Sequence, residues 1–583
     1  MDFGTRRGTI VAALVVCGLA ILVPSLASAH IERASYWPDP TGGHVPKVRS
    51  LASALIKPKG KTRVVCRSNS IKRLRKSVRR AIRRGYKDRP TQKRKQLSRR
   101  QGRRLLRINR RLKRRCKFHS IQAAVSASGN NDRVVIMPGL YTEPKSRRAP
   151  TNNPKCDGLE ETNDKGQTGA LSYAYQVQCP NDQNLIAVIG RKPGGPAPQP
   201  PLDDRHGIPN LGPCIRCHLQ LEGSGVSADD VVVDAGRVAS GNHGPANPVK
   251  DVGIRIDRAD GFVLRRLTVR HAREHGIYIL ESLGYVLEKF KVFYNEEYGV
   301  LTFVEDYGVI RNCEAAGSGD AGLYPGSSAE TGEDVQAPDH FRYSQRLTRC
   351  DMHHNALGYS GTNSNAVHID HNNFYGNAMG LSTDVFTGAG HPGFPQDSDL
   401  IENNRFYSNN FNVYGSHSDV VPTVPVPVGV GMWIAGGNNN TVRNNHFYDN
   451  WRRGVMLFGV ADAFICDAPN DPVYGCDPAE THTSFRNRFS GNVMGRTPSG
   501  KRKPNGTDFW WDNIQGQVNN CWFNNRGKNG TRASITSVPN SLPSDCATSD
   551  GTDPPFTNAQ LDELLLCVTD DPACTWFQTP PKP

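Results

Sequence analysis

The chain has 583 residues, of which 37% are hydrophobic and 8% aromatic, so it can build a sizeable core. Its 57 Gly and 40 Pro indicate a turn-rich fold and argue against a helix bundle or a coiled coil. The net charge of +17 comes from one segment, because residues 67–117 hold 25 of the 72 basic residues and a single acidic one, Asp88. The rest of the chain is mildly acidic, so polyanion binding is expected only of that segment.

The N-terminus has the features of an export signal. Two arginines precede a largely apolar run, and the small residues Ala27-Ser28-Ala29 are typical of a cleavage site. We therefore expect residues 1–29 to be a signal peptide, with an uncleaved membrane anchor as the alternative. The mature chain is expected to be secreted or associated with the cell envelope.

The cysteines agree with export. Fourteen remain once Cys17 of the apolar run is set aside, an even number that suits an oxidising compartment. Close spacing predicts local disulfides, although Cys214 and Cys217 could instead form a redox or metal pair. The expected bonds are Cys156–Cys179, Cys214–Cys217, Cys466–Cys476, Cys521–Cys546 and Cys567–Cys574.

Residues 30–65 are expected to be loop, and residues 66–117 a basic helical hairpin. Each half places apolar residues on one helical face, and Gly85 and Pro90 interrupt the pattern between them. A Cys66–Cys116 bond would close the base. The hairpin is expected to contact an anionic envelope polymer or a membrane surface, and export argues against a physiological nucleic acid. The alternative is a solvated insertion with no ligand. The apolar residues are Ile71, Leu74, Val78 and Ile82, then Leu97, Leu105, Ile108 and Leu112.

The main body is repetitive. Gly261-Phe-Val-Leu is followed 23 residues later by Gly284-Tyr-Val-Leu, and the same period separates Gly276 from Gly299. Apolar residues alternate with period 2, and 23 residues are too few for a propeller blade, so a β-solenoid is predicted over residues 118–530, with a disulfide-containing cap at 531–583. Recurring Asn-x-Phe-x-x-Asn motifs predict one column of left-handed Asn residues at a turn. That column would contain Asn355, Asn377, Asn409, Asn450 and Asn492.

The segments 118–125 and 134–143 resemble the opening helix and first coil of right-handed parallel β-helix proteins of the pectin lyase-like superfamily. The later repeats resemble the NosD-type parallel β-helix repeat. The resemblance implies an all-β, single-stranded right-handed solenoid. Members of the superfamily include polysaccharide lyases, hydrolases, epimerases, phage tailspikes and non-catalytic surface proteins. We therefore expect a secreted protein that acts on or binds an acidic, uronic-acid polysaccharide, or a non-catalytic envelope or adhesion protein.

The first candidate site is a column of charged residues. Alignment of the repeats stacks Asp370, Glu402 and Arg443 on successive coils, flanked by His368 and His371. Two close carboxylates suit acid–base or nucleophilic catalysis, or Ca²⁺ binding. Because Arg443 neighbours Glu402, the pKa of Asp370 is expected to rise, which would make it the proton donor. The alternative is a charge ladder on a sheet face.

The second candidate site lies on insertions between coils. These are expected to gather over one face, where loops on a rigid scaffold could bind substrate or remain decoration. Aromatic rings could stack on sugars, and guanidinium groups could hold a sugar carboxylate, although core anchors and exposed turn residues are the commoner roles. No metal-ligand set is assigned. The residues are Asp384 and His391 as catalytic candidates, and Asp320, Tyr324, Trp433, Trp451, Arg452 and Arg453 as substrate-binding candidates.

Overall fold

The computed structural model describes most of the chain. The described residues are 35–39, 42–56, 60–162, 168–195, 208, 211–237, 244, 246–329, 331, 342–386, 392–460, 484–553, 567 and 574–583. The expected signal peptide, His391 and the Cys466–Cys476 pair lie outside them. Among the helices of the described part, none is both long and apolar enough to cross a membrane.

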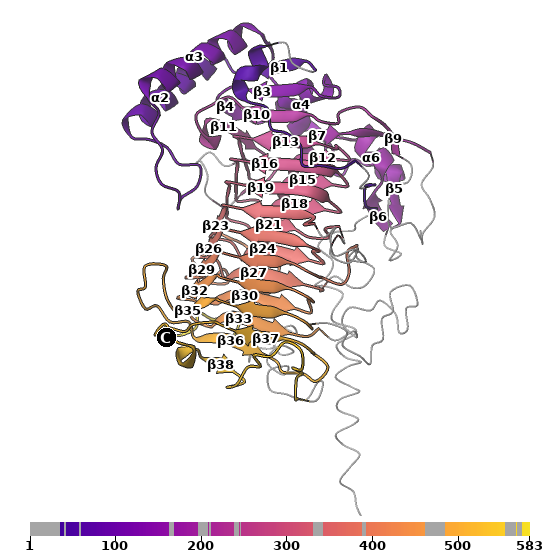
Figure 1. The fold of residues 1–583 in the computed structure, drawn as a ribbon. Coiled ribbons are helices and arrows are strands. Elements are labelled where there is room, and N and C mark those ends of the chain that lie inside the picture. The colour runs from indigo at the N-terminus through magenta and orange to yellow at the C-terminus, as the bar shows by residue number, and fades with distance from the viewer. Residues whose placement is uncertain are drawn as a thin grey trace, which may run out of the picture.

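Three long parallel sheets form a stack of coils (Figure 1), each coil adding one strand to sheet 1, then sheet 2, then sheet 3. Sheet 1 contains β1 (Thr62–Val65), β2 (Cys116–Phe118), β3 (Arg133–Ile136), β10 (Gln220–Gly223), β13 (Phe262–Arg265), β16 (Leu283–Glu288), β19 (Asp306–Arg311), β22 (Gln345–Thr348), β25 (Val367–Asp370), β28 (Leu400–Glu402), β31 (Thr441–Arg443), β34 (Arg488–Ser490) and β37 (Cys521–Phe523).

Sheets 2 and 3 complete each coil. Sheet 2 contains β4 (Gly139–Tyr141), β11 (Val231–Asp234), β14 (Thr268–Arg270), β17 (Lys291–Phe293), β20 (Glu314–Ala316), β23 (Asp351–His353), β26 (Asn373–Tyr375), β29 (Arg405–Tyr407), β32 (His446–Tyr448) and β35 (Val493–Met494). Sheet 3 contains β7 (Asn184–Ile189), β12 (Val252–Asp257), β15 (His275–Leu280), β18 (Tyr298–Phe303), β21 (Ala321–Pro325), β24 (Leu357–Thr362), β27 (Met379–Asp384), β30 (Val430–Ala435), β33 (Arg453–Phe458), β36 (Thr507–Trp511) and β38 (Ser537–Val538).

The remaining elements lie at the ends and edges. They are α2 (Ser70–Arg83), α3 (Arg99–Arg114), α4 (Ile121–Ser126), α5 (Pro144–Arg148) and α6 (Tyr173–Gln178); the short antiparallel pairs β5 (Glu160–Thr162) with β6 (Thr168–Leu171) and β8 (Arg191–Pro193) with β9 (Leu211–Cys214); and the 3-10 turns η2 (Leu51–Leu55), η3 (Asp157–Leu159), η4 (Ala228–Asp230) and η6 (Arg532–Ser534).

The core runs down the inside of the solenoid. Strand alternation turns apolar side chains inward, as with Ile369 of sheet 1, Phe374 of sheet 2 and Leu381 of sheet 3, each 0% exposed. Successive coils align these side chains, so Phe374 stacks on Phe406 at 4.5 Å and Phe406 on Phe447 at 4.6 Å. The short helix α4 covers the N-terminal end of this core with Ile121, Ala124 and Val125.

The glycine repeat marks the second position of the sheet 3 strands. Gly276 and Gly299 occupy it on adjacent coils, and a Cβ atom on Gly276 would lie 2.6 Å from the carbonyl oxygen of Gly299. No side chain fits this approach, which explains the 23-residue recurrence of glycine in the sequence.

The asparagines form ladders, but not the single column that the sequence predicted. Asn355, Asn377, Asn409 and Asn450 do stack between sheets 2 and 3, each backbone N–H and side-chain amide donating to the next side-chain oxygen, and the ladder continues to Asn505. Asn492 lies instead between sheets 1 and 2, where it accepts from Asn445 and donates to Asn525.

The left-handed residue at these turns was also assigned wrongly. Positive φ belongs to the residue before the asparagine at four of these turns, namely His354 at 57°, Gly376 at 62°, Ser408 at 52° and Asp449 at 60°. The asparagines are needed for their amides, which donate to buried backbone carbonyl groups along the ladder.

The N-terminal region joins the solenoid earlier than residue 118. Strand β1 pairs in parallel with both β2 and β3, so part of the segment 30–65 that was expected to be loop belongs to sheet 1. The hairpin of α2 and α3 follows β1 and returns to β2, with Cys66 bonded to Cys116 as predicted. Leu112 packs with Val64, Val135 and Met137, so the hairpin covers the outer face of the first coils.

Candidate functional site

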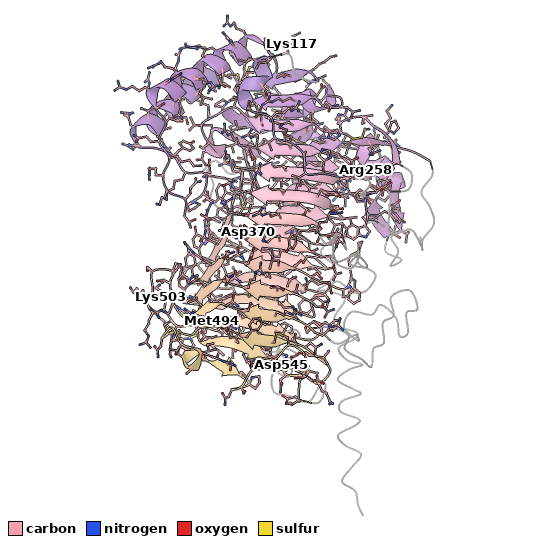
Figure 2. All side chains as sticks on the ribbon, viewed as in Figure 1. Lys117, Arg258, Asp370, Met494, Lys503 and Asp545 are labelled. Atoms are coloured by element: carbon pink, nitrogen blue, oxygen red, sulfur yellow. A yellow bond between two sulfur atoms is a disulfide. The ribbon has the colours of Figure 1, made fainter. Side chains whose placement is uncertain are left out.

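The column of Asp370, Glu402 and Arg443 forms as the sequence predicted. Asp370 of β25 lies beside Glu402 of β28, and Glu402 lies beside Arg443 of β31, on the outer face of sheet 1. Ile369 and Ile401 directly precede Asp370 and Glu402 on these strands, and their side chains point inward, as alternation requires. Figure 2 labels Asp370 midway along the stack of coils.

Asp370 is held by a dense set of donors. Arg346 of β22 donates from Nε to Oδ1 at 2.8 Å and from Nη2 to Oδ2 at 3.0 Å, and the Thr348 hydroxyl donates to Oδ2 at 3.0 Å. His371 Nδ1 lies 2.7 Å from the same oxygen. The carboxylate is therefore almost wholly covered, with 1% of Asp370 exposed.

The predicted rise in the pKa of Asp370 is wrong. Burial alone would raise this pKa, but the hydrogen bonds from Arg346, His371 and Thr348 outweigh burial and lower it to about 2. Asp370 is therefore ionised at neutral pH and cannot serve as the proton donor. The decisive partner, Arg346, was missed because its coil has Met352 where the aligned coils have phenylalanine.

Glu402 contacts both a histidine and an arginine. Its Oε1 lies 3.0 Å from His368 Nε2, and its Oε2 accepts from Arg443 Nε at 2.8 Å. Burial opposes ionisation, but these two partners lower the pKa of Glu402 below its usual value. Glu402 keeps its charge, as expected, and orients the His368 imidazole, whose ring packs against Tyr343 at 4.8 Å.

The chemistry open to this cluster is narrower than the sequence suggested. Both carboxylates remain ionised, so proton transfer would fall to His368, with Glu402 as its orienting partner. The guanidinium side chains of Arg346 and Arg443 are 48% and 47% exposed and could meet an anionic ligand. Each guanidinium is already paired with a carboxylate. Earlier coils of sheet 1 carry a similar alternation of basic and acidic residues, at Arg265, Glu288 and Arg311.

The second candidate group gathers on the outer face of sheet 3, but its members are buried. Tyr324, Ser382 and Trp433 share one column of this face, and Trp433 Nε1 and Asp384 both bond the Ser382 hydroxyl. Burial raises the pKa of Asp384. Asp320, Tyr324, Asp384 and Trp433 are each between 4% and 6% exposed, so Trp433 is a packing residue.

The other aromatic and arginine candidates serve the protein itself. Trp451 donates from Nε1 to Asp449. Arg452 donates to the carbonyl oxygens of Val428, Thr575 and Gln578 and so fastens the C-terminal tail to sheet 3. Arg453 lies over the Trp510 ring at 4.5 Å. Arg452 and Arg453 therefore have protein partners in place of the sugar carboxylate that was expected.

The hairpin carries the strongest unpaired charge in the described structure. Every Lys and Arg of α2 and α3 except Lys113 is exposed, and none of these exposed groups forms an ion pair among the described residues. The apolar stripes face inward, where Leu74, Val78 and Ala81 pack with Val226 of the solenoid. Ser77 donates to Asp230, and Asn109 donates to the Ser224 carbonyl, so the hairpin is fixed to the solenoid body.

Six disulfides are present in the described residues. Five were predicted: Cys66–Cys116, Cys156–Cys179, Cys214–Cys217, Cys521–Cys546 and Cys567–Cys574. The sixth, Cys313–Cys350, joins adjacent coils and was not predicted. Two groups have metal-ligand spacing, Cys66 and Cys116 with His119, and Cys214 and Cys217 with Asp260, but the cysteines of both are disulfide-bonded.

The three parallel sheets and their ladders define a parallel β-helix protein. A family model described as the right handed beta helix region matches residues 246–459, which agrees with the predicted handedness and fold. No significant match is found among curated proteins.

Solved structures show a distant likeness. The A-module of the mannuronan C-5 epimerase AlgE4 of Azotobacter vinelandii is 14% identical, with 75% of this chain and 95% of that chain covered and a TM-score of 0.37. An alginate lyase from a Paenibacillus species is 11% identical, with 67% and 94% covered and a TM-score of 0.27. The pectate lyase Pel9A is 11% identical, with 76% of each chain covered and a TM-score of 0.30.

Proposed function

We propose that this protein is exported and binds an acidic polysaccharide, with the exposed face of the hairpin as its main anionic contact. The observation that carries the proposal is the unpaired, exposed basic surface of α2 and α3 on a hairpin closed by a disulfide. Six disulfides support an oxidising compartment outside the cytosol.

The composition of this surface favours a soluble polyanion over a membrane. Interfacial helices bury an apolar face in the lipid, whereas the apolar faces of α2 and α3 pack on the solenoid. Arginine outnumbers lysine on both helices, and its planar fork pairs with carboxylate groups through two hydrogen bonds. A polyuronate presents one carboxylate per sugar and so matches a row of guanidinium groups.

Such a row follows one face of α3. Arg100, Arg104, Arg107, Arg111 and Arg114 are separated by alternating steps of four and three residues, which places them on one face about one helical turn apart. Their spacing therefore repeats along the helix as the carboxylates repeat along a polyuronate chain.

The test is equilibrium binding of polygalacturonate to the full chain and to a variant in which these five arginines are changed to glutamine. Unscreened charges at low salt give the largest effect, and we expect affinity to fall at least about tenfold. A matched control changes five exposed basic residues outside the hairpin to glutamine and should bind like the unaltered protein: Lys145, Arg148, Lys155, Arg486 and Arg532.

Equal binding by both variants would contradict the proposal. The same incubations report catalysis, since a lyase would generate unsaturated uronates that absorb ultraviolet light and a hydrolase would release reducing ends. The oriented pair of His368 and Glu402 is where such activity would be sought first.

A further inference from the structure

An aromatic ladder runs along the outer face of sheet 2. His353, Tyr375, Tyr407 and Tyr448 occupy the same position on four successive coils. Their rings stack with centroids 5.1, 5.0 and 5.0 Å apart and nearly parallel planes. The recurring Phe-Tyr pair of the repeats produces this ladder, because alternation turns each phenylalanine inward and the tyrosine after it outward.

The tyrosine hydroxyls of this ladder are not used by the protein. Tyr375, Tyr407 and Tyr448 make no side-chain hydrogen bond to any described residue, although each phenol can donate one bond and accept others. Burial of the rings raises all three pKa values, that of Tyr448 to about 12, so the hydroxyls keep their protons at physiological pH. The face thus carries a row of neutral hydroxyl groups at the spacing of the coils, two on the half-buried Tyr375 and Tyr407 and the third on Tyr448, which is 8% exposed.

Positive charge lies beside and beyond the row. Arg405 is exposed in the adjacent column, next to Tyr407, and has no ion-pair partner among the described residues. At one end, the loop joining α2 to α3 binds this sheet, where Arg89 and Thr91 hydrogen-bond to Asp351 and Thr91 accepts from Asn373. That loop presents Lys93 and Arg94, both exposed.

The other end of the row has a second basic loop. Residues 495–503 follow β35, and they present Lys501 and Arg502 to solvent while Lys503 pairs with Asp449 at 2.7 Å. Figure 1 shows the hairpin loop and this loop projecting on the same side of the solenoid, and Figure 2 labels Lys503 there.

The geometry points to the outer face of sheet 2 as the place where the sugar rings of the bound acidic polysaccharide lie. The chain would run along the solenoid axis between the two basic loops, with its hydroxyls bonded to Tyr375, Tyr407 and Tyr448 and a carboxylate on Arg405. This inference rests on the proposed function and adds to it, because the hairpin arginines recognise charge, whereas the tyrosine row recognises sugar hydroxyls. A repeating polymer meets an equivalent protein group at each coil, and positive charge at both ends suits an anionic chain.

The test removes only the hydroxyl groups. The triple variant Tyr375→Phe, Tyr407→Phe and Tyr448→Phe keeps the stacked rings, so its melting temperature should match that of the unaltered protein. Binding is measured with two polyanions, oligogalacturonate and poly-L-glutamate, because the second has carboxylates but no sugar hydroxyls. We expect about a tenfold or larger loss of affinity for oligogalacturonate from three lost hydrogen bonds, and no change for polyglutamate.

A matched control places the same substitution elsewhere. Tyr307→Phe, on sheet 1, should leave binding of both polymers unchanged. Oligogalacturonate affinity in the triple variant equal to that of the unaltered protein would overturn the inference while leaving the hairpin proposal intact. An equal loss for both polymers would also overturn it, since the row would then act through general packing. If the unaltered chain binds neither polymer, the proposed function itself fails.

Discussion

Single residues on the outer wall of this solenoid differ sharply in how much they stabilise it. Asp370 lies on the outer face of sheet 1, but it is covered by Arg346, Thr348 and His371. These hydrogen-bond donors stabilise the ionised form of Asp370. Hydrogen bonds to a charged group are stronger than neutral ones, so Asp370 should contribute measurably to the free energy of unfolding.

We therefore predict that Asp370→Asn lowers the unfolding free energy at pH 7 by roughly 1–3 kcal/mol. The folded pKa of Asp370 is lowered to about 2 from an unfolded value of about 3.9, so its stabilisation is present above about pH 4 and is lost as the pH falls through 2. Urea-unfolding midpoints measured between pH 2 and pH 7 should show a shallower acid decline in the variant. Glu402→Gln, at a more exposed carboxylate, should have the smaller effect, and the reverse order would contradict this account.

At the scale of elements, the hairpin is part of the folded body. Its helix α3 covers Val64, Val135 and Met137 of the first coils. Deletion would expose these side chains, so loss of ligand binding in a deletion variant could reflect damage to the solenoid. Surface charge substitutions on α3 avoid this ambiguity, which is why they form the binding test.

The packing of α3 can be tested directly. Leu112 is fully buried at the base of the hairpin, and Leu112→Ala should lower the unfolding free energy by about 2–5 kcal/mol, since it leaves a cavity between helix and sheet. Leu106 packs instead against the cluster of Leu74, Val78 and Ala81 and is only partly buried, so Leu106→Ala should cost less. Denaturant unfolding of the two variants measures this difference, and equal small losses would mean that the hairpin is loosely attached.

Across the whole molecule, the fold could be predicted because its signal is local and repeated. Alternation with period 2 and the 23-residue glycine spacing both reflect contacts made identically on each coil. The wrong assignment of Asn492 to the column of Asn355, Asn377, Asn409 and Asn450 has the same origin. Asparagine occupies more than one turn of a coil, so the motif 487–492 looks like 445–450 although Phe489 pairs with Val442 of sheet 1 and not with Phe447.

The site was harder to predict because it depends on neighbours in other coils. The column of Asp370, Glu402 and Arg443 follows from register alone, whereas the donor that sets the pKa of Asp370 comes from the preceding coil, where Met352 replaces the phenylalanine that marks the repeat. Burial of Asp384 and Trp433 depends on long-range packing over sheet 3, which spacing does not report. The tyrosine row, by contrast, was readable from the repeated Phe-Tyr pairs.

The claim that a single polyuronate chain contacts both the hairpin and sheet 2 is tested most directly by mapping which arginines the ligand covers. The full chain is treated with an arginine-specific dicarbonyl reagent, with and without oligogalacturonate, and modification of each residue is quantified by mass spectrometry. The account predicts that the ligand slows modification of Arg104, Arg107 and Arg111 on α3 and of Arg405 on sheet 2, and leaves the exposed Arg148 and Arg532 unchanged. Equal modification of all these arginines with and without the ligand would contradict it.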